Sequence, residues 1–387
     1  MDRYIQSYYE GDLDKGREIL EELTSDVKHK DLYDTVLWNA KYYIRRCPGE
    51  KVKIFKPRIF TEKVEKEKKF AINPFIVQDT KTQQIIVGVR VTNAAANDGI
   101  NPMIFQGKVR TKYEIYIYDK DLKTLIRHFG LTMNLPKLVD RVFFATGYED
   151  FRAISSPDPD VLIGTCTGIE SHQAGPVRMC RFHLRIQREG DEITGLVAEN
   201  LVPLTGYGED KQQKNWTLLP LNSGPGQIVY STTPLILLQE DLKRPGYCVE
   251  KITVPNRFFN YRNGTPFVPF SFSEEKGKEE TGEKEGTGEK DGLIKEGYLT
   301  ISHTSMDHPK ERRRIYYHRF FFFSKEFKLL QHSPLFFFEA NNTVEFASDM
   351  IYHEDQRVFY IAFGFRDRVS YIHKITLTEL LSFMHII

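Results

Sequence analysis

The chain has 387 residues, and its 54 Lys and Arg balance 53 Asp and Glu to a formal net charge of +1. That balance excludes a protein that grips nucleic acid through a strongly basic surface, and it equally excludes an acidic disordered scaffold. Hydrophobic residues make up 40% of the chain and charged residues 28%, which is typical of a soluble globular protein with a sizeable core. We therefore expect no nucleic-acid partner.

The four cysteines are widely spaced and include no C-x-x-C pair, so neither a zinc ribbon nor a disulfide-dense secreted scaffold is expected. The start of the chain leads into a charged amphipathic stretch instead of an apolar signal core. No apolar run approaches the roughly 18 residues that a membrane span needs. The sequence thus predicts a reduced, cytoplasmic protein without a membrane span, and it leaves the oligomeric state open.

Residues 1–48 carry a helical pattern in two successive stretches. Apolar side chains recur at helical spacing, first at Leu13, Ile19, Leu20 and Leu23, and then at Leu32, Val36, Leu37, Ala40 and Tyr43. Asp12, after Gly11, is a suitable N-cap for the first stretch. The sequence predicts a short N-terminal helical hairpin over 1–48, which is either half of a helical repeat or a packing appendage.

From about residue 70 the period of the apolar residues changes to two, as in 114–118, 179–186 and 314–322. Short strands separated by Gly, Asn, Asp and Pro turns indicate a sandwich, a barrel or a propeller. About 300 residues is too long for a simple sandwich and suits five blades of four strands, at roughly 60 residues per blade. The prediction is an all-β, five-bladed β-propeller over residues 49–387.

One stretch departs from this composition. Residues 273–292 are rich in Glu, Lys, Gly and Thr and contain two copies of Gly-Glu-Lys. Without an apolar anchor the stretch cannot offset its ordering entropy, so it is predicted to be a disordered loop inserted in the propeller.

Two polar clusters stand beside strand patterns in the first half of the predicted propeller. In 147–152, paired acidic residues are followed by Arg, and this combination suits sugar chemistry: one carboxyl transfers a proton, another holds hydroxyls, and the guanidinium fixes their geometry. Taken alone, the same string is more often a surface ion pair. In 214–216, a cation, an amide and an indole can grip a sugar ring or a phosphate, although a polar turn with a packed Trp fits as well.

The second half supplies further candidates. His303 ends an alternating strand, and Asp307 and His308 follow it, but no third well-spaced ligand set appears, so no metal site is predicted. The run 317–319 places His and Arg in a strand of Tyr and Phe, where charged groups must face either solvent or a polar channel. Glu345 and Asp367 complete the set of candidates.

The order and strand context of these clusters resemble a known family, the five-bladed β-propeller proteins related to β-mannoside phosphorylases and to bacterial glycosyltransferase-like proteins. The resemblance runs from about residue 73 to about residue 380. It rests on the successive motifs Asn73-Pro74-Phe75-Ile76, Val89-Arg90-Val91-Thr92-Asn93, Gly147-Tyr148-Glu149-Asp150-Phe151-Arg152, Lys214-Asn215-Trp216, Arg262-Asn263-Gly264-Thr265-Pro266, His303, Tyr317-His318-Arg319, Val344-Glu345-Phe346-Ala347 and Gly364-Phe365-Arg366-Asp367-Arg368. The chain departs from the family at Phe151, where Pro or Ala is usual, and at Asn263, where Gly is usual.

The resemblance implies roles for these residues. Asp150 looks like the family's catalytic acid, and a role as proton donor requires its pKa to be raised, which a low-dielectric channel with Glu149 beside it would do. Substrate-binding roles around the central pocket fall to Asn73, Arg90, Glu149, Arg152 and Trp216. A wall that holds a phosphate or a nucleotide-sugar diphosphate is expected from Lys214, Asn215, His303, Tyr317, His318 and Arg319. Glu345 and Asp367 would bind sugar hydroxyls or orient His318 and Arg319.

Three functions are compatible with this pattern. The first is a glycosyltransferase that moves a hexose, mannose-like, from an activated donor to a glycan acceptor. The second is a phosphorylase or hydrolase of β-linked oligosaccharides, and the third is a non-catalytic propeller that serves as a binding platform. The expected partner is a carbohydrate substrate, with a nucleotide sugar or inorganic phosphate as co-substrate and no further cofactor.

Overall fold

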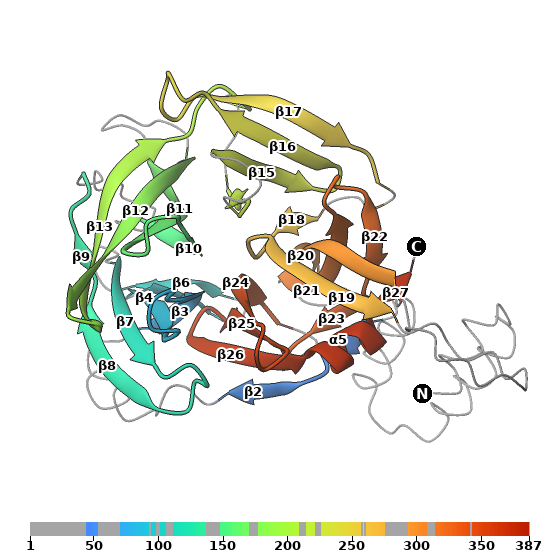
Figure 1. The fold of residues 1–387 in the computed structure, drawn as a ribbon, viewed down its shortest axis with the longest axis horizontal. Helices are drawn as coiled ribbons and strands as arrows, with labels where there is room; N and C mark the ends of the chain where they lie inside the picture. Colours follow the sequence, from blue (N-terminus) through green and yellow to red (C-terminus); the bar gives the residue numbers. More distant parts are fainter. Residues whose placement is uncertain are drawn as a thin grey trace, which may run out of the picture.

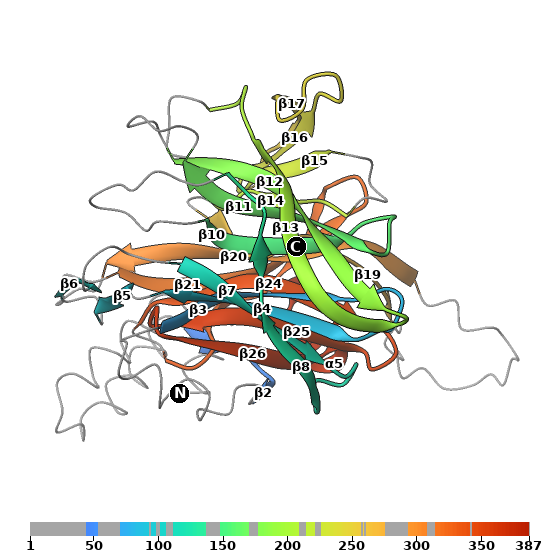
Figure 2. The same ribbon diagram turned by 90° about the vertical axis from the view of Figure 1, so that its left-hand side faces the viewer.

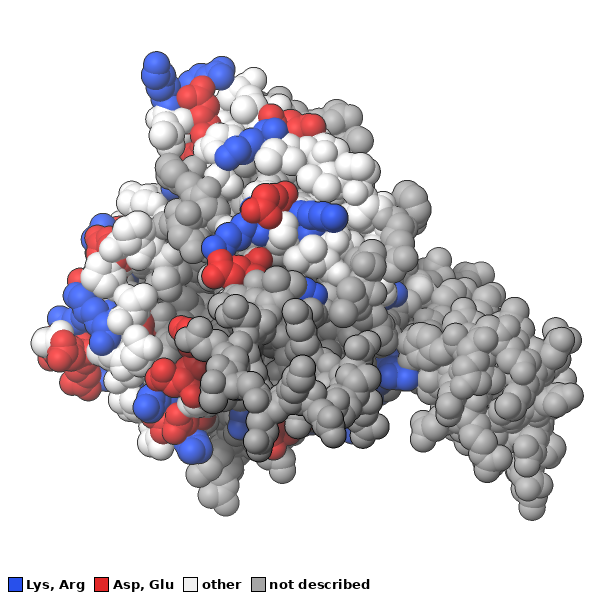
Figure 3. All heavy atoms as spheres, turned by 45° about the vertical axis from the view of Figure 1, so that its right-hand side comes forward, with Lys and Arg blue, Asp and Glu red and all other residues white. Residues whose placement is uncertain are grey.

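The computed structural model describes residues 44–52, 70–92, 94–97, 101–105, 111–136, 148–169, 177–208, 214–220, 226–256, 258, 261–274, 293–307, 314–340 and 343–386. These residues form an all-β, propeller-like ring of sheets (Figure 1). Figure 3 shows Lys and Arg interspersed with Asp and Glu on the face in view, which agrees with the balanced net charge. In the described part of the chain, no helix is long and apolar enough to cross a membrane.

Four sheets are regular blades, each built around antiparallel neighbours. The first contains β3 (Phe70–Gln78), β4 (Ile85–Thr92), β7 (Thr111–Tyr118) and β8 (Leu125–Gly130). The second contains β10 (Glu149–Ser155), β11 (Val161–Ile169), β12 (Val177–Glu189) and β13 (Glu192–Pro203), with the short β9 (Thr132–Met133) added to β13. The third contains β14 (Thr217–Leu218), β15 (Gln227–Thr232), β16 (Leu235–Glu240) and β17 (Cys248–Val254). The fourth contains β24 (Glu345–His353), β25 (Val358–Phe365), β26 (Val369–Thr376) and β2 (Glu50–Val52).

The remaining large sheet is irregular. Its centre is the pair β20 (Leu293–Asp307) and β21 (Arg314–Ser324), and its other strands are β1 (Ile44–Arg46), β18 (Arg262–Asn263), β19 (Val268–Glu274), β22 (Leu329–His332), β23 (Leu335–Phe337) and β27 (His385–Ile386). A separate hairpin of β5 (Ala94–Asn97) and β6 (Asn101–Phe105) projects from one face of the ring (Figure 2).

The expectation of five equivalent blades is therefore wrong: four regular blades are found, together with one eight-stranded sheet. The physical reason is strand length. β20 has 15 residues and β21 has 11, so each is long enough to pair with two short strands in succession. β18 and β19 both pair with β20, while β22 and β23 both pair with β21.

Strands from the start of the described chain close the ring against strands from its end. β2 pairs antiparallel with β26, and β1 pairs parallel with β23. The predicted helical hairpin is not supported at residues 44–46, which form β1, because Ile44 is buried with Ile315, Tyr317 and Leu335. Residues 1–43 of that hairpin lie outside the described residues, as does the predicted insertion beyond the end of β19 at Glu274.

The aromatic residues fill the space between neighbouring sheets. Along β21, Phe320 and Phe322 pack into one buried cluster while Phe321 and Phe323 pack into another, because successive side chains of a strand point to opposite faces. Each fully buried Phe contributes roughly 1.5–3 kcal/mol relative to an exposed one. The run of four Phe therefore joins two cores across one strand.

The one helix of the described residues, α5 (Leu377–Phe383), follows β26 and covers the edge of the eight-stranded sheet. Thr376 caps it: the Thr376 hydroxyl accepts a hydrogen bond from the Glu379 amide, and the Glu379 carboxylate accepts one from the Thr376 amide. This capping box satisfies backbone donors that the first turn leaves unpaired.

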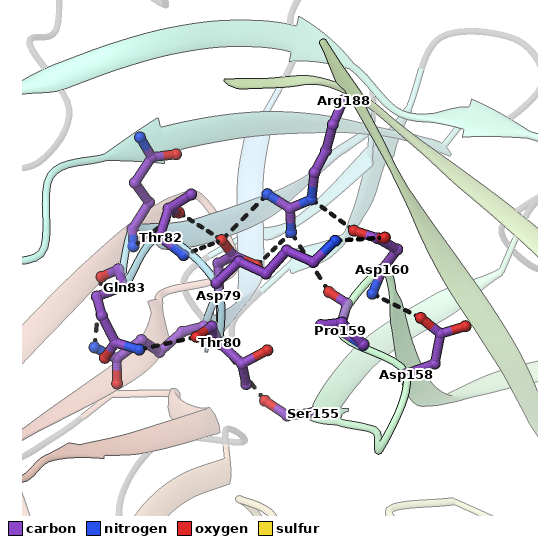
Figure 4. Close-up of polar contacts among 12 residues, drawn as sticks. Asp79, Thr80, Thr82, Gln83, Ser155, Asp158, Pro159, Asp160 and Arg188 are labelled. Carbon is purple, nitrogen blue, oxygen red and sulfur yellow. Dashed lines mark hydrogen bonds and ion pairs between the residues drawn. The ribbon is translucent and has the colours of Figure 1, made fainter. Parts of the chain in front are cut away.

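An ion-pair network fastens the first blade to the second, as Figure 4 shows. Arg188, near the end of β12, donates from Nη2 to Asp79 Oδ1 at 2.5 Å and from Nε to Asp160 Oδ1 at 2.6 Å. Asp79 is fully buried in the turn after β3. Burial alone would raise the pKa of Asp79, but hydrogen bonds from Arg188 and Thr82 hold it below its usual value. Asp160 also meets Lys81 at 2.7 Å, on the exposed side of the network.

Replacing Arg188 with Ala should lower the free energy of unfolding by about 3–5 kcal/mol, because it leaves the Asp79 charge buried without its partner. Lys81→Ala, which breaks the exposed pair, should cost at most about 1 kcal/mol. Denaturant titration at pH 7 measures both values.

The same network should make the stability of the folded protein depend on pH in acid. Because the pKa of Asp79 is depressed in the folded state, its stabilisation is present above the usual Asp pKa of about 3.9 and is lost as pH falls through the lower folded value. The stability difference between wild type and Arg188→Ala should therefore shrink below pH 4. Equal losses for the two variants at pH 7 would contradict this account.

Candidate functional site

The strands that face the axis of the ring carry polar residues at strained backbone positions. Asn73 on β3, Asp150 on β10 and Asn215 just before β14 have φ values of 44°, 55° and 65°. Such values are uncommon outside glycine, although Asn and Asp tolerate them best. The pairing of β3 with β4 shifts register around Asn73, and that of β10 with β11 shifts around Asp150. Bulges of this kind re-aim side chains and often adjoin active sites.

Three acidic residues, Glu149, Asp150 and Asp367, form what we call the carboxyl cluster. Asn73 Nδ2 donates to Asp150 Oδ1 at 2.7 Å, and Arg90 Nη1 lies 3.4 Å from the same oxygen. Arg90 Nη2 donates to Glu149 Oε1 at 2.7 Å. Within the described part of the chain both donors to Asp150 reach Oδ1, so Oδ2 is left for a ligand.

Asp367 reaches the cluster from the turn between β25 and β26, where its φ is 48°. Two backbone hydrogen bonds set this turn against its neighbours: Ala71 N donates to Arg368 O at 3.1 Å, and Arg366 N donates to Val344 O at 2.8 Å. Close packing sets the approach as well, because a Cβ on Gly364 would lie 2.7 Å from Asn73 Oδ1. Glycine at 364 thus lets the last blade lie directly against Asn73.

Electrostatics separate the two aspartates of the cluster. Burial favours a higher pKa for Asp150, yet Arg90, Lys214, Arg152 and the Asn73 amide together hold it below its usual value. Burial raises the pKa of Asp367, and the Asp150 and Glu149 charges raise it further against the influence of Arg90. The expectation of a raised pKa at Asp150 is therefore wrong, because the three cations and the Asn73 hydrogen bond outweigh burial. It is Asp367 whose proton is retained to higher pH.

Lys214 and Arg152 differ in their access to this site. Lys214 Nζ lies 4.0 Å from Glu149 Oε2, and its side chain is 45% exposed. Arg152 is only 1% exposed and donates to three acceptors of the protein: Gly264 O at 2.7 Å, Asn215 Oδ1 at 3.1 Å and Asp150 O at 3.2 Å. Lys214 can therefore meet a ligand, whereas Arg152 is engaged within the protein.

The cationic wall expected from the second half of the chain is not assembled. Burial lowers the pKa of His318 to about 3, and its Nε2 accepts a hydrogen bond from Ala347 N. Burial also lowers the pKa of His303 well below its usual value, with His318 and Arg152 adding to the effect. Both histidines are therefore neutral at pH 7 and supply no positive charge.

Tyr317 and Arg319 lie on the opposite face of β21 from His318. Tyr317 is fully buried with Ile44, Ile315 and Leu335. Arg319 donates from Nε to Tyr261 Oη at 3.0 Å and from Nη1 to the Ser333 carbonyl. These contacts place both side chains in the packing of the eight-stranded sheet, apart from the carboxyl cluster.

Two further candidate residues, Trp216 and Glu345, have structural roles. Trp216 is 1% exposed in the core between the second and third blades, so its indole has no open face for a sugar. Glu345 accepts hydrogen bonds from the backbone amides of Phe338, Glu339 and Ala340. These bonds lower its pKa, but burial has the larger effect and raises the pKa to about 7. Its oxygens hold a loop, and none of these contacts involves His318 or Arg319.

Asp349 on β24 is a central residue that the sequence interpretation missed. Its Oδ2 accepts from Ala153 N at 3.2 Å and from Ile76 N at 3.4 Å, and its Oδ1 accepts from Met350 N at 2.8 Å. The carboxyl therefore joins β10, β3 and β24. Burial raises its pKa to about 8, although the amide donors and Arg152 oppose the rise. The available signal was an acidic residue inside the apolar run 346–352.

Within the described residues, no group of three or more His, Cys, Asp or Glu side chains is placed to hold a metal ion. The side chains that the structure does bring together are Asn73, Arg90, Glu149, Asp150, Lys214 and Asp367. They offer hydrogen-bond acceptors, one exposed cation and two aspartates of different proton affinity, which is a set suited to a polyhydroxylated ligand and to proton transfer.

Comparison with solved structures finds three informative neighbours. A glycosyl hydrolase from Bacteroides ovatus is 12% identical, with a TM-score of 0.47 over 81% of this chain and 85% of that one. A β-1,2-mannobiose phosphorylase from Listeria innocua is 12% identical, with a TM-score of 0.46 over 81% of this chain and 91% of that one. A Trypanosoma rangeli sialidase in complex with sialic acid is 7% identical, with a TM-score of 0.39 over 81% of this chain and 55% of that one.

No protein-family model matches the chain, and no curated protein sequence matches it significantly. Structural similarity at these identities and scores carries no conclusion about chemistry. The function is therefore inferred from the site itself.

Asp349→Ala should lower the free energy of unfolding by at least about 3 kcal/mol, because three buried amides lose their acceptor at roughly 1–3 kcal/mol each. Asp355→Ala, the same change at an exposed position in the turn after β24, should alter stability by less than about 0.5 kcal/mol. Urea unfolding checks the pair, and a small effect at Asp349 would show that the three strands are held by packing alone.

Proposed function

We propose that the protein cleaves glycosidic bonds in β-linked oligosaccharides, as a hydrolase or a phosphorylase, with Asp150 at the reaction centre. The observation that supports this most directly is the carboxyl cluster around Arg90. Glycoside cleavage needs one carboxyl to protonate the leaving oxygen and an anion to assist attack or to stabilise the sugar cation. The raised pKa of Asp367 suits the proton donor, and the lowered pKa of Asp150 suits the anion.

In the proposed reaction, Asp367 gives its proton to the glycosidic oxygen as the bond from that oxygen to the anomeric carbon breaks. Asp150 takes a proton from the attacking water, whose oxygen forms the new bond to the anomeric carbon. If phosphate attacks instead, its oxygen forms that bond and the product is a sugar 1-phosphate. Asn73 and Arg90 hold the Asp150 carboxylate through Oδ1, which leaves Oδ2 to face the reacting group.

The glycosyltransferase reading is not supported. It relied on a wall of cations for a diphosphate, but His303 and His318 are neutral, and Arg319 is bound to Tyr261 and Ser333. Among the cations near Asp150 in the described residues, Lys214 is the exposed one, and a single exposed lysine favours water over phosphate as the attacking group.

The decisive experiment compares Asp150→Asn and Asp367→Asn on a panel of aryl and oligosaccharide β-glycosides, with and without inorganic phosphate. Both variants should lose at least 100-fold in kcat on oligosaccharides. An aryl glycoside with a good leaving group needs no proton donor, so it should restore turnover in Asp367→Asn but not in Asp150→Asn. The reverse pattern would make Asp150 the acid, and no turnover with any wild-type substrate would favour a binding platform.

The rate of the wild type should follow a bell-shaped pH profile. The acidic limb should lie below the usual Asp range, because Asp150 must be ionised and its pKa is lowered. The alkaline limb should lie above that range, because Asp367 must be protonated and its pKa is raised. Initial rates of oligosaccharide cleavage from pH 3 to 9 measure both limbs, and Asp367→Asn should remove the alkaline one. An aryl glycoside with a good leaving group should lack the alkaline limb even with the wild type, because its cleavage needs no proton donor.

A further inference from the structure

Arg152 connects three segments that meet at the axis of the ring. Its Nη1 donates to the carbonyl oxygen of Asp150, two residues before it on β10. Its Nη2 donates to the side chain of Asn215, just before β14, and its Nε donates to the carbonyl oxygen of Gly264, between β18 and β19. One planar guanidinium therefore fixes the relative positions of the second blade, the third blade and the eight-stranded sheet.

Two of these acceptors belong to residues whose backbone is in the left-handed region of conformation, with positive φ. Asp150 and Asn215 have φ values of 55° and 65°. Holding a non-glycine residue in that conformation costs of order 1–3 kcal/mol, so it persists only where the surroundings determine it. Arg152 bonds to the backbone carbonyl of the first residue and to the amide side chain of the second, which is direct support for both.

The third acceptor depends on close backbone packing. A Cβ on Gly264 would lie 2.7 Å from Ala347 O and 2.8 Å from Ile301 O, so only glycine fits there. This packing places the Gly264 carbonyl against Arg152 Nε, at 2.7 Å. The acceptor is therefore as rigid as the sheet that supplies it.

Arg152 has little means of touching a ligand. It is 1% exposed, three of its donors are bound to protein acceptors, and its guanidinium lies 5.5 Å from the centre of the Phe346 ring. This separates it from Arg90, which bonds directly to the Asp150 carboxylate, and from the exposed Lys214. Any effect of Arg152 on a bound sugar must pass through the residues that it holds.

We propose that Arg152 is a positioning residue, which fixes the backbone of Asp150 and so aims its carboxylate, without contacting substrate. The proposal rests on the proposed function, in which Asp150 acts at the reaction centre. Geometry and charge contribute separately. The fork of three hydrogen bonds sets the direction of the carboxylate, and the positive charge adds to those of Arg90 and Lys214 in lowering the pKa of Asp150.

Two substitutions separate these contributions. Arg152→Lys keeps the charge but cannot reach three acceptors at once, whereas Arg152→Gln loses the charge as well. We expect kcat to fall about 100-fold in both, since a misplacement near 1 Å costs that much, while KM stays within about 3-fold of wild type. The acidic limb of the pH profile should keep its position in Arg152→Lys and move to higher pH in Arg152→Gln. Arg185→Lys and Arg185→Gln, at an exposed arginine of the same sheet, are the matched controls.

Thermal unfolding and near-ultraviolet circular dichroism establish that each variant is folded before its kinetics are interpreted. A raised KM with an unchanged kcat would overturn the proposal by making Arg152 a substrate ligand. A wild-type kcat in Arg152→Lys would overturn it too, because charge alone would then suffice.

A measurement that needs no substrate keeps this inference separate from the proposed function. Carbon-13 NMR of labelled aspartate carboxyls, with Asp150 assigned from the Asp150→Asn spectrum, follows the titration of that group directly. We expect a shifted or multiplied Asp150 signal in Arg152→Lys and a raised pKa in Arg152→Gln. An unchanged signal and titration in both variants would refute the positioning role, even if cleavage of glycosides were demonstrated. Failure to find any cleavage would refute the proposed function and leave the NMR result standing.

Discussion

The buried Asp349 carboxyl is the constraint on which the centre of this ring depends. Strands that face the axis of a propeller have no partner strand on their inner side, so the amides along that side need other acceptors. Asp349 supplies them for Ile76 and Ala153, on two different blades, and for its own neighbour Met350. Ile76 and Ala153 each lie shortly after the bulge that carries Asn73 or Asp150, so this one carboxyl ties both bulged strands to β24.

Around Asp150, the two arginines Arg90 and Arg152 have distinct roles. Arg90 bonds to Glu149 and Asp150 and lowers the pKa of Asp150, while burial and like charges raise the pKa of Asp367 against the influence of Arg90. Arg152 touches carbonyl groups and an amide, and so acts on position more than on charge. Arg90 reaches the Asp150 side chain from the first blade, whereas Arg152 lies two residues beyond Asp150 on the same strand and bonds to its backbone carbonyl.

The all-β class and the first half of the site could be predicted from the sequence, because period-two patterning and the 147–152 motif are local signals. The wall from the second half could not. Successive residues of a strand point to opposite faces, so Arg319 and His318 could not both face one channel, and burial decided which faced the core. Neither burial nor the direction of a pKa shift is visible in a motif, which is why the sequence favours a raised pKa at Asp150, whereas in the structure the pKa of Asp150 is lowered and that of Asp367 is raised. The blade count failed for a similar reason, since strand length decides how many partners β20 and β21 accept.

The closure of the ring has a consequence for how the chain folds as it is made. β1 and β2 precede their partners β23 and β26 by about 290 to 325 positions in the sequence. Until those partners have been made, β1 and β2 have no sheet to join, and their own backbone groups stay open to other strands. Contacts so distant in sequence form slowly, because a long loop must close before they are gained. A ribosome-bound chain that still lacks β23 and β26 must therefore keep β1 and β2 from pairing with a neighbour.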